Sequence, residues 1–350
     1  MKIFKILLFI LILALFLNGA KTFEKIETWH PGDETFGPFS FGIIDEDGKI
    51  IAAFFYSGNR VITPNKIIKI APRGQGPGDL TDMMALFHHN NDIAFVERAD
   101  KVKIFQKEGE TYKIKEIKWL KRGKYAHTIS DGIYLDNKWF LAGFEMIDAD
   151  IDKKIQHISF LKIYDKEGKP LKNLIKKQLD KANQFYLMDY YVVNYKDFVY
   201  FLPENELTVH LISLKELQVE KVVKLEIPEF YKKMPADFYA WKMYNKPNES
   251  LRKDFETWKT SYSRINKVVT ADDYLVLQMR TCSDKLKKFA LLFYNANTFK
   301  LEKTIFINDL LINTRDSKYY FFANGDPGRD EEAEDVKIHI CSFRGKAKKK

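Results

Sequence analysis

The chain has 350 residues, of which 45% are hydrophobic and 15% aromatic, so it can bury a large core and is not intrinsically disordered. Its formal net charge is +9, but two of the basic residues lie in the first twenty positions and five lie in the last seven. Residues 21–343 therefore carry a net charge of only +2, which excludes the broad basic face that nucleic-acid binding requires. We expect the basic tail at 344–350 to be a solvated end of the chain.

The first predicted element is a signal peptide at residues 1–20. Two lysines precede an unbroken apolar run from Ile6 to Leu17, and the small residues Gly19 and Ala20 follow it. This run of 12 residues is short for a membrane-spanning helix, which needs about 20. We therefore expect a mature chain that begins near Lys21, is periplasmic or extracellular, and is not stably inserted in a membrane. The alternative is an uncleaved signal that anchors the chain in the inner membrane.

From residue 23 onward, short apolar and alternating runs follow one another along the chain. Turn sequences such as DEDGK, QKEGE and DKEGK separate them. No helical segments alternate with these runs, which excludes a βαβ fold and indicates an all-β sandwich, barrel or propeller.

Internal repeats decide among these three folds. KIFQKEGETYKIKEI, from Lys103, and KIYDKEGKPLKNLI, from Lys162, share a strand, a turn and a second strand. Each copy resembles the outer hairpin of a four-stranded unit, and six such units of about 35–50 residues have the size of propeller blades. The units span 36–71, 81–118, 126–175, 185–226, 263–307 and 309–343.

The sixth unit lacks an outer strand. The segment TFEKIETW at 22–29 can supply that strand, and this closure would join the last blade to the first and remove an open sheet edge. The sequence therefore predicts an all-β, six-bladed β-propeller of four-stranded antiparallel blades over residues 21–343.

The stretch RGQGPGDL at 73–80 follows the outer strand of the first unit. A Walker-type phosphate loop requires a lysine and a serine or threonine after the last glycine, and a dinucleotide fingerprint requires another glycine spacing within a βαβ unit. Neither pattern is present. We interpret the stretch as the crossing to the second blade, in which glycines allow positive φ and close backbone approach and the proline stiffens the chain.

This stretch also resembles a family motif. In its position after the first outer strand, it is similar to the GxGPG[DE][FL] stretch of the six-bladed β-propeller family of exported bacterial proteins, which includes NHL-like and TolB-like propellers. The matching residues are Gly74, Gly76, Pro77, Gly78 and Asp79. The resemblance implies the fold and an exported location, but it implies no particular reaction because propellers have many functions. The lipoprotein cysteine of many relatives is absent here.

Residues 228–262 interrupt the pattern between the fourth and fifth units with helix-forming residues and nine aromatic residues. We predict a helical insertion here. Its aromatic side chains either pack against the propeller or form a lid over a ligand groove that would suit a sugar or a peptide. The candidate ligand-binding residues are Trp241, Tyr244 and Trp258.

No catalytic or metal-binding pattern is evident in the sequence. Asp148, Asp150 and Asp152 begin like a calcium loop, but Lys153 and Ser159 occupy the positions that require glycine and glutamate. The histidines are scattered, and no GxSxG nucleophile motif occurs. We expect no metal and no cofactor.

The sequence predicts a monomeric binding or scaffolding module for a protein, peptide or carbohydrate, rather than an enzyme. The alternative is a propeller hydrolase or lactonase with a metal in the central channel. Cys282 and Cys341 form either a disulfide or two buried thiols, and the sequence does not decide between these.

Overall fold

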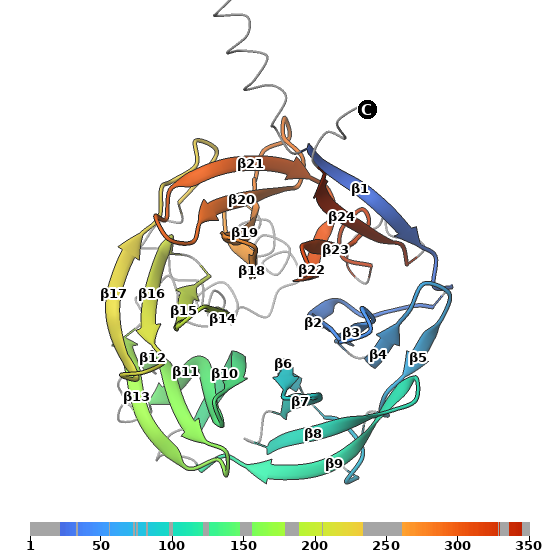
Figure 1. The fold of residues 1–350 in the computed structure, drawn as a ribbon, viewed down its shortest axis with the longest axis vertical. Coiled ribbons are helices and arrows are strands. Elements are labelled where there is room, and N and C mark those ends of the chain that lie inside the picture. Colours follow the sequence, from blue (N-terminus) through green and yellow to red (C-terminus); the bar gives the residue numbers. More distant parts are fainter. Residues whose placement is uncertain are drawn as a thin grey trace, which may run out of the picture.

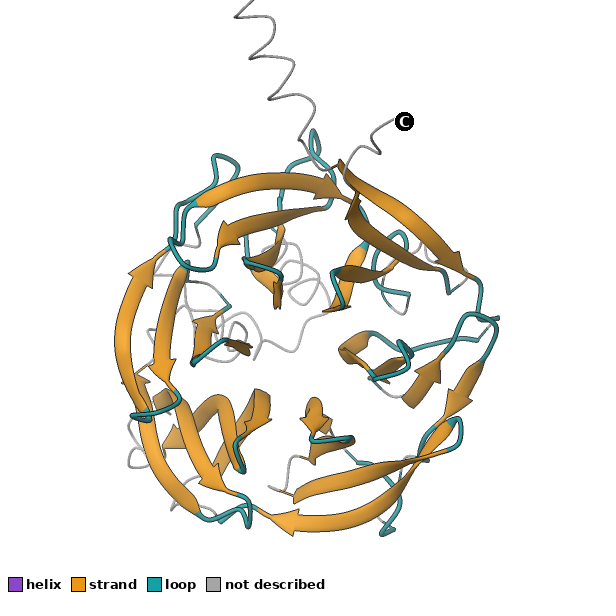
Figure 2. Ribbon diagram, in the orientation of Figure 1, coloured by secondary structure: helices purple, strands orange, loops and turns teal. Residues whose placement is uncertain are grey.

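The computed structural model describes residues 22–344, apart from 33, 56, 73, 75, 82, 98–100, 122–125, 148–155, 179–188, 205, 234–260, 328 and 330–335. Strands, turns and loops make up this part of the chain, with no helix among the described residues (Figure 2). The strands form six four-stranded antiparallel sheets around a central axis (Figure 1). The fold is the six-bladed β-propeller that the sequence predicts.

The first three blades run from an inner strand beside the axis to an outer strand at the rim (Figure 1). Blade 1 contains β2 (Phe39–Ile44), β3 (Ile50–Phe54), β4 (Gly58–Ile62) and β5 (Ile67–Lys69). Blade 2 contains β6 (Met83–His89), β7 (Asp92–Glu97), β8 (Lys101–Glu108) and β9 (Thr111–Trp119). Blade 3 contains β10 (Ala126–Leu135), β11 (Lys138–Ile147), β12 (Gln156–Asp165) and β13 (Pro170–Gln178).

Blades 4 and 5 follow the same order. Blade 4 contains β14 (Tyr190–Tyr195), β15 (Phe198–Pro203), β16 (Thr208–Ser213) and β17 (Gln218–Lys224). Blade 5 contains β18 (Ile265–Ala271), β19 (Tyr274–Arg280), β20 (Phe289–Asn295) and β21 (Leu301–Ile307).

Blade 6 combines the two ends of the described chain. Its inner three strands are β22 (Leu310–Arg315), β23 (Lys318–Phe322) and β24 (Ile338–Arg344), and its outer strand is β1 (Thr22–Trp29). β1 pairs antiparallel with β24, from Thr22 opposite Arg344 to Trp29 opposite Ile338. The predicted closure is therefore confirmed, and it covers the outer edge of β24 (Figure 1).

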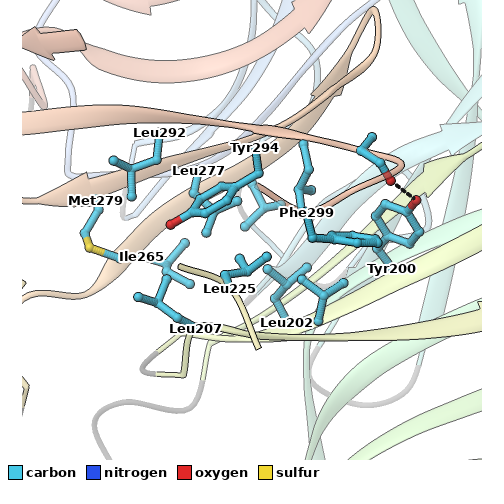
Figure 3. Close-up of a cluster of buried hydrophobic side chains, with 14 of the residues drawn as sticks. Tyr200, Leu202, Leu207, Leu225, Ile265, Leu277, Met279, Leu292, Tyr294 and Phe299 are labelled. Carbon is cyan, nitrogen blue, oxygen red and sulfur yellow. Dashed lines mark hydrogen bonds between the residues drawn. The ribbon is translucent and has the colours of Figure 1, made fainter. Parts of the chain in front are cut away.

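The hydrophobic core is divided into six clusters, one between each pair of neighbouring blades. The middle strands are apolar on both faces, because each face packs against another blade; β3 and β20 are almost entirely buried. Figure 3 shows the cluster between blades 4 and 5, where the Tyr200 hydroxyl donates to the Ala296 carbonyl at 3.0 Å. The outer strands are more polar and expose residues along most of their length, as β17 does.

A basic side chain recurs at one register of the third strand in five blades. Cross-strand pairing shows that the equivalent position of the third strand holds Arg60, Lys103, Lys162, His210 or His339 in these five blades. In blade 5, Leu292 occupies this position. Four of the five basic residues contact a carboxylate, as Arg60 Nη2 contacts Glu34 at 2.6 Å. Two partners lie on the second strand of the same blade and two lie in the segment that leads into the inner strand. These pairs are repeated structural anchors of the blades.

The prediction of a helical insertion at 228–262 is not supported. Residues 234–260 lie outside the described residues, and the described ends of the segment are loops and turns. Tyr231 N–H donates to Pro228 O at 2.9 Å, which forms one turn, but the next N–H, of Lys232, donates to Ser263 Oγ at 3.0 Å instead of continuing a helix. Ser263 N–H donates in return to Lys232 O at 2.9 Å. The chain therefore leaves and re-enters the propeller at one point.

Candidate functional site

The glycine stretch forms a tight turn between β5 and β6. Leu80 N–H donates to Pro72 O at 3.0 Å, and the Asp79 carboxylate accepts the N–H of Gly76 at 2.9 Å. Beneath the turn, the Lys103 ammonium donates to the carbonyl oxygens of Gly76 and Asp79. Because the turn directs carbonyl oxygens toward a lysine, it is built around a buried cation of the protein itself.

The structural reason for the glycines differs from position to position. None of the three has a backbone φ in the left-handed region, so the expectation of positive φ is not met. A Cβ at Gly74 would overlap Asp79 Oδ2 and stand 2.9 Å from its Cγ, and a Cβ at Gly76 would stand 2.9 Å from the same oxygen. At Gly78, the nearest atom to a Cβ is a methyl carbon of Ile114 at 3.8 Å, an ordinary contact. Close approach therefore requires glycine at the first two positions only.

We expect Gly74→Ala to lower the free energy of unfolding by about 1 kcal/mol or more, because the Asp79 carboxylate would have to move and give up its bond to Gly76 N–H. Gly78→Ala is the matched control and should be neutral or slightly stabilising, since alanine restricts the unfolded chain. Urea unfolding of the two variants measures the difference. Equal losses in both variants would contradict the assignment of the strain to Gly74.

The candidate site is a pocket of about 820 Å³ between blades 5 and 6. Its lining residues come from both blades and from the closing strand β1: Ile26, Asp272, Asp273, Tyr274, Phe293, Asn295, Glu302, Lys303, Asp316, Ser317, Lys318, Ser342 and Phe343. Four carboxylates and two lysines line it, so the formal charge of the lining is −2. Its volume is within the range of small-molecule sites, roughly 300–1,000 Å³, and most of its lining residues are polar or charged.

The pocket rim is held by hydrogen bonds between blades. In the turn between β18 and β19, the Asp272 carboxylate accepts the hydroxyl of Ser317, which belongs to the turn between β22 and β23. Asp273 Oδ1 accepts the hydroxyl of Tyr195, from blade 4, at 3.0 Å. The first bond fixes the two turns relative to each other, and the second ties the turn of blade 5 to blade 4.

The pocket and the described ends of the segment 228–262, at Lys232 and Ser263, lie at opposite ends of the propeller. In an antiparallel four-stranded blade, the first and third turns share one end, and the outer strand finishes at the other. The rim turns at 272–273 and 316–317 are first turns, whereas Lys232 and Ser263 belong to the connection that follows an outer strand. The predicted residues Trp241, Tyr244 and Trp258 lie outside the described residues.

Near the axis, where the alternative function would require a metal, the structure describes separate charges. Asp131 on β10 is half-buried and accepts the N–H of Val192 at 2.8 Å; burial raises the pKa of its carboxyl to about 6. Burial lowers the pKa of Lys267, on β18, and the Asp131 charge partly opposes that shift. Within the described residues, no cluster of three or more His, Cys, Asp or Glu side chains is suited to a metal ion.

The His339–Asp309 pair is the arrangement closest to a catalytic dyad. The histidine Nδ1 lies 2.7 Å from Asp309 Oδ2, and the N–H of Asn324 donates to the other carboxylate oxygen at 3.1 Å. However, His339 occupies the recurrent third-strand register at which other blades place Lys103 and Lys162. Its position is therefore explained by the blade repeat.

The two cysteines are free thiols in the structure, where Cys341 is buried and Cys282 is half-buried. Burial raises the pKa of both thiols, that of Cys341 to about 12. Protonated thiols are poor nucleophiles, so neither cysteine is a candidate catalytic group.

Known structures share the fold. The chain is similar to a member of the DUF4221 family from Bacteroides vulgatus, with a TM-score of 0.58, 11% identity, and coverage of 93% of this chain and 99% of that one. It is also similar to a protein of Bacteroides fragilis that is named as exported, with a TM-score of 0.52, 13% identity and coverage of 93% and 96%. The likeness is one of fold.

A luciferin-regenerating enzyme is similar to a comparable degree, with a TM-score of 0.51, 10% identity, and coverage of 94% of this chain and 96% of the enzyme. No protein-family model matches the sequence, and no curated protein matches it. Among the described residues, no helix has the length and apolar character needed to cross a membrane. At these identities, the shared propeller fold assigns no activity to this chain.

Proposed function

We propose that the protein is an exported ligand-binding module that acts as a monomer in the periplasm or outside the cell and is related to NHL-like propellers. The observation that carries the binding role is the pocket between blades 5 and 6, with its hydrogen-bonded rim. Its lining offers carboxylates, amines, hydroxyls and aromatic rings for recognition, but no histidine or cysteine to act as base or nucleophile. The exported location rests on the signal-like sequence at 1–20.

The second candidate function is a hydrolase or lactonase with a metal in the channel. The fold shared with the luciferin-regenerating enzyme suggests this function. However, the described charged residues near the axis, such as Asp131 and Lys267, do not form a cluster of metal ligands. Elemental analysis of protein purified without chelators separates the two functions. A stoichiometric, tightly held divalent metal would favour the hydrolase.

The binding function predicts ligands whose effect depends on the pocket. We would screen peptides, sugars and small metabolites by thermal unfolding against three proteins: the unmodified chain, Ser342→Trp, which fills the pocket, and a chain with 234–260 replaced by a short glycine–serine linker. Because Lys232 and Ser263 already meet, the linker need span only a short gap. A ligand at 100 times its Kd should stabilise the protein by about 2.7 kcal/mol.

Ligands of the pocket should stabilise the unmodified chain and the deletion variant but not Ser342→Trp. Glu220→Trp, on an exposed position of β17, controls for the added aromatic ring. If ligands instead depend on 234–260 and ignore Ser342→Trp, the binding site is in the insertion, where Trp241, Tyr244 and Trp258 are the candidates. If no ligand depends on either region, the binding function is wrong.

A further inference from the structure

The floor of the pocket is aromatic. Phe293 is fully buried, and its ring makes edge contacts with Phe343 at 5.2 Å and with Tyr274 at 5.7 Å between centroids. Phe23, from β1, packs against both phenylalanines, at 6.1 Å from Phe293 and 5.1 Å from Phe343 between centroids. Because Phe293 is fully buried, the half-buried rings of Tyr274 and Phe343 are the ones that can meet a ligand, and ring faces carry the partial negative charge that attracts cations.

One cation already occupies this floor. The ammonium of Lys303, on β21, lies 4.3 Å from the centroid of the Phe343 ring, and burial lowers the pKa of this lysine. The side chain thus places its amine over the ring face where that face meets the pocket. This contact is a model, within the protein, of how an amine from a ligand would bind.

Two carboxylates of the pocket accept hydrogen bonds from neutral donors. Glu302 accepts hydrogen bonds from the Asn295 amide, at 3.0 Å, and from the Tyr274 hydroxyl, whose pKa is raised by burial and by this bond. Asp272 accepts the hydroxyl of Ser317. These donors are neutral, and within the described structure no lysine or arginine lies within ion-pair distance of either Glu302 or Asp272. Both carboxylates line the pocket.

We propose that this pocket binds a ligand through a protonated amine or guanidinium group, which the Glu302 and Asp272 carboxylates attract and the aromatic floor receives. The inference rests on the proposed binding function and adds its ligand class. Two sources can present such groups, namely lysine or arginine side chains of a peptide, and free polyamines. A volume of about 820 Å³ accommodates more than one side chain, so a short basic peptide fits the pocket better than a single amine.

The test uses probes that differ in charge and in source. Trilysine, triglutamate and trialanine peptides with blocked ends, together with spermidine, are titrated into the full chain by calorimetry at low and high salt. We expect trilysine to bind, triglutamate and trialanine not to bind, and the affinity for trilysine to fall as salt screens the carboxylates. Tighter binding of trilysine than of spermidine would assign the amine to a peptide, and the reverse order would assign it to a polyamine.

Variants locate the binding in this pocket. Glu302→Gln and Asp272→Asn keep their hydrogen-bond acceptors but remove the charge, and each should weaken trilysine binding about tenfold. Asp284→Asn, on an exposed loop outside the pocket, is the charge-matched control and should change the affinity little. Lys303→Met removes the internal amine from the Phe343 ring and should tighten binding, whereas Lys300→Met, an equal change of charge outside the pocket, should not.

Three results would overturn the inference: triglutamate binding as well as trilysine, unchanged trilysine affinity in Glu302→Gln and Asp272→Asn, or equal effects of the pocket variants and their controls. Thermal unfolding of each variant excludes loss of the fold as the cause. A failure of the proposed binding function can be told apart from a failure of the cationic ligand class. If neutral or acidic ligands bind and Ser342→Trp blocks them, the binding function stands and only the cationic class is refuted. If no ligand binds the pocket, both are refuted.

Discussion

Replacing Lys103 by methionine is expected to lower the free energy of unfolding by about 3–5 kcal/mol. Lys103 and Glu97 are each only 1% exposed, and the ammonium lies 3.2 Å from Glu97 Oε1 while it also donates to the carbonyls of Gly76 and Asp79. Methionine keeps the apolar stem of the side chain as far as the ε position, but among the described residues it leaves the buried carboxylate with only the Lys101 ammonium, at 3.5 Å, as a charged partner. It also leaves the carbonyls of the glycine turn without this donor.

Urea unfolding of a small set of variants isolates this effect. The double variant Glu97→Gln/Lys103→Met should recover much of the loss, because it removes the buried charge on both sides. Lys101→Met removes only the more exposed partner of Glu97 and should cost less than about 1 kcal/mol. If Lys103→Met and Lys101→Met lost the same stability, the anchoring role of the buried pair would be refuted.

The fold was predictable because its signals are local. Each blade is a run of apolar strands separated by turn residues, and the outer hairpin repeats its sequence from Lys103 and again from Lys162. The closure by β1 followed from the count of strands in the last unit, which needed a partner for β24. Strand order, blade number and closure therefore depend on patterns that a single sequence displays.

The buried anchors were not predictable from the same repeats. Both repeats begin with the lysine of the anchor, but Glu97 lies 6 residues before Lys103, whereas Glu145 lies 17 residues before Lys162. The loop between the second and third strands differs in length, so the spacing does not recur and only the strand register shows the equivalence. The sequence predicted one role for all three glycines of the stretch, because the same residue repeats. In the structure, only two of the three positions approach Asp79 closely.

No local pattern in the sequence marks the candidate pocket. Its lining extends from Ile26 to Phe343, and the acidic residues at 272–273 and 316–317 look like ordinary hairpin turns in the sequence. Only the ring closure brings β1 and β24 beside blade 5. Aromatic side chains at 228–262 are conspicuous in the sequence, whereas Phe293 and Phe343 are indistinguishable from other core residues. Sequence reasoning therefore pointed to the insertion and missed the pocket.

Removal of residues 22–29 is expected to have the largest effect of all, namely loss of cooperative folding. Trp29 is 6% exposed and packs against Tyr320 at 5.9 Å, while Phe23 contacts four aromatic rings between blades 5 and 6. Loss of one buried aromatic side chain costs about 3–5 kcal/mol, and the deletion removes the buried Trp29 and the half-buried Phe23 together with the strand pairing. The sum approaches the net stability of about 5–15 kcal/mol that folded domains possess.

Circular dichroism and thermal unfolding of chains that begin at Lys21 and at His30 measure this effect. The shorter chain would expose β24 as a new sheet edge and should aggregate or melt without a sharp transition. A synthetic peptide of residues 22–29, added in excess, should restore a cooperative transition, and a peptide with Phe23 and Trp29 replaced by alanine should not. Because Ile26 also lines the pocket, the restored chain should regain trilysine binding together with its fold. A chain starting at His30 that melts as sharply and at the same temperature as the longer one would show that five complete blades and a three-stranded sixth suffice, and that β1 does not hold the ring closed.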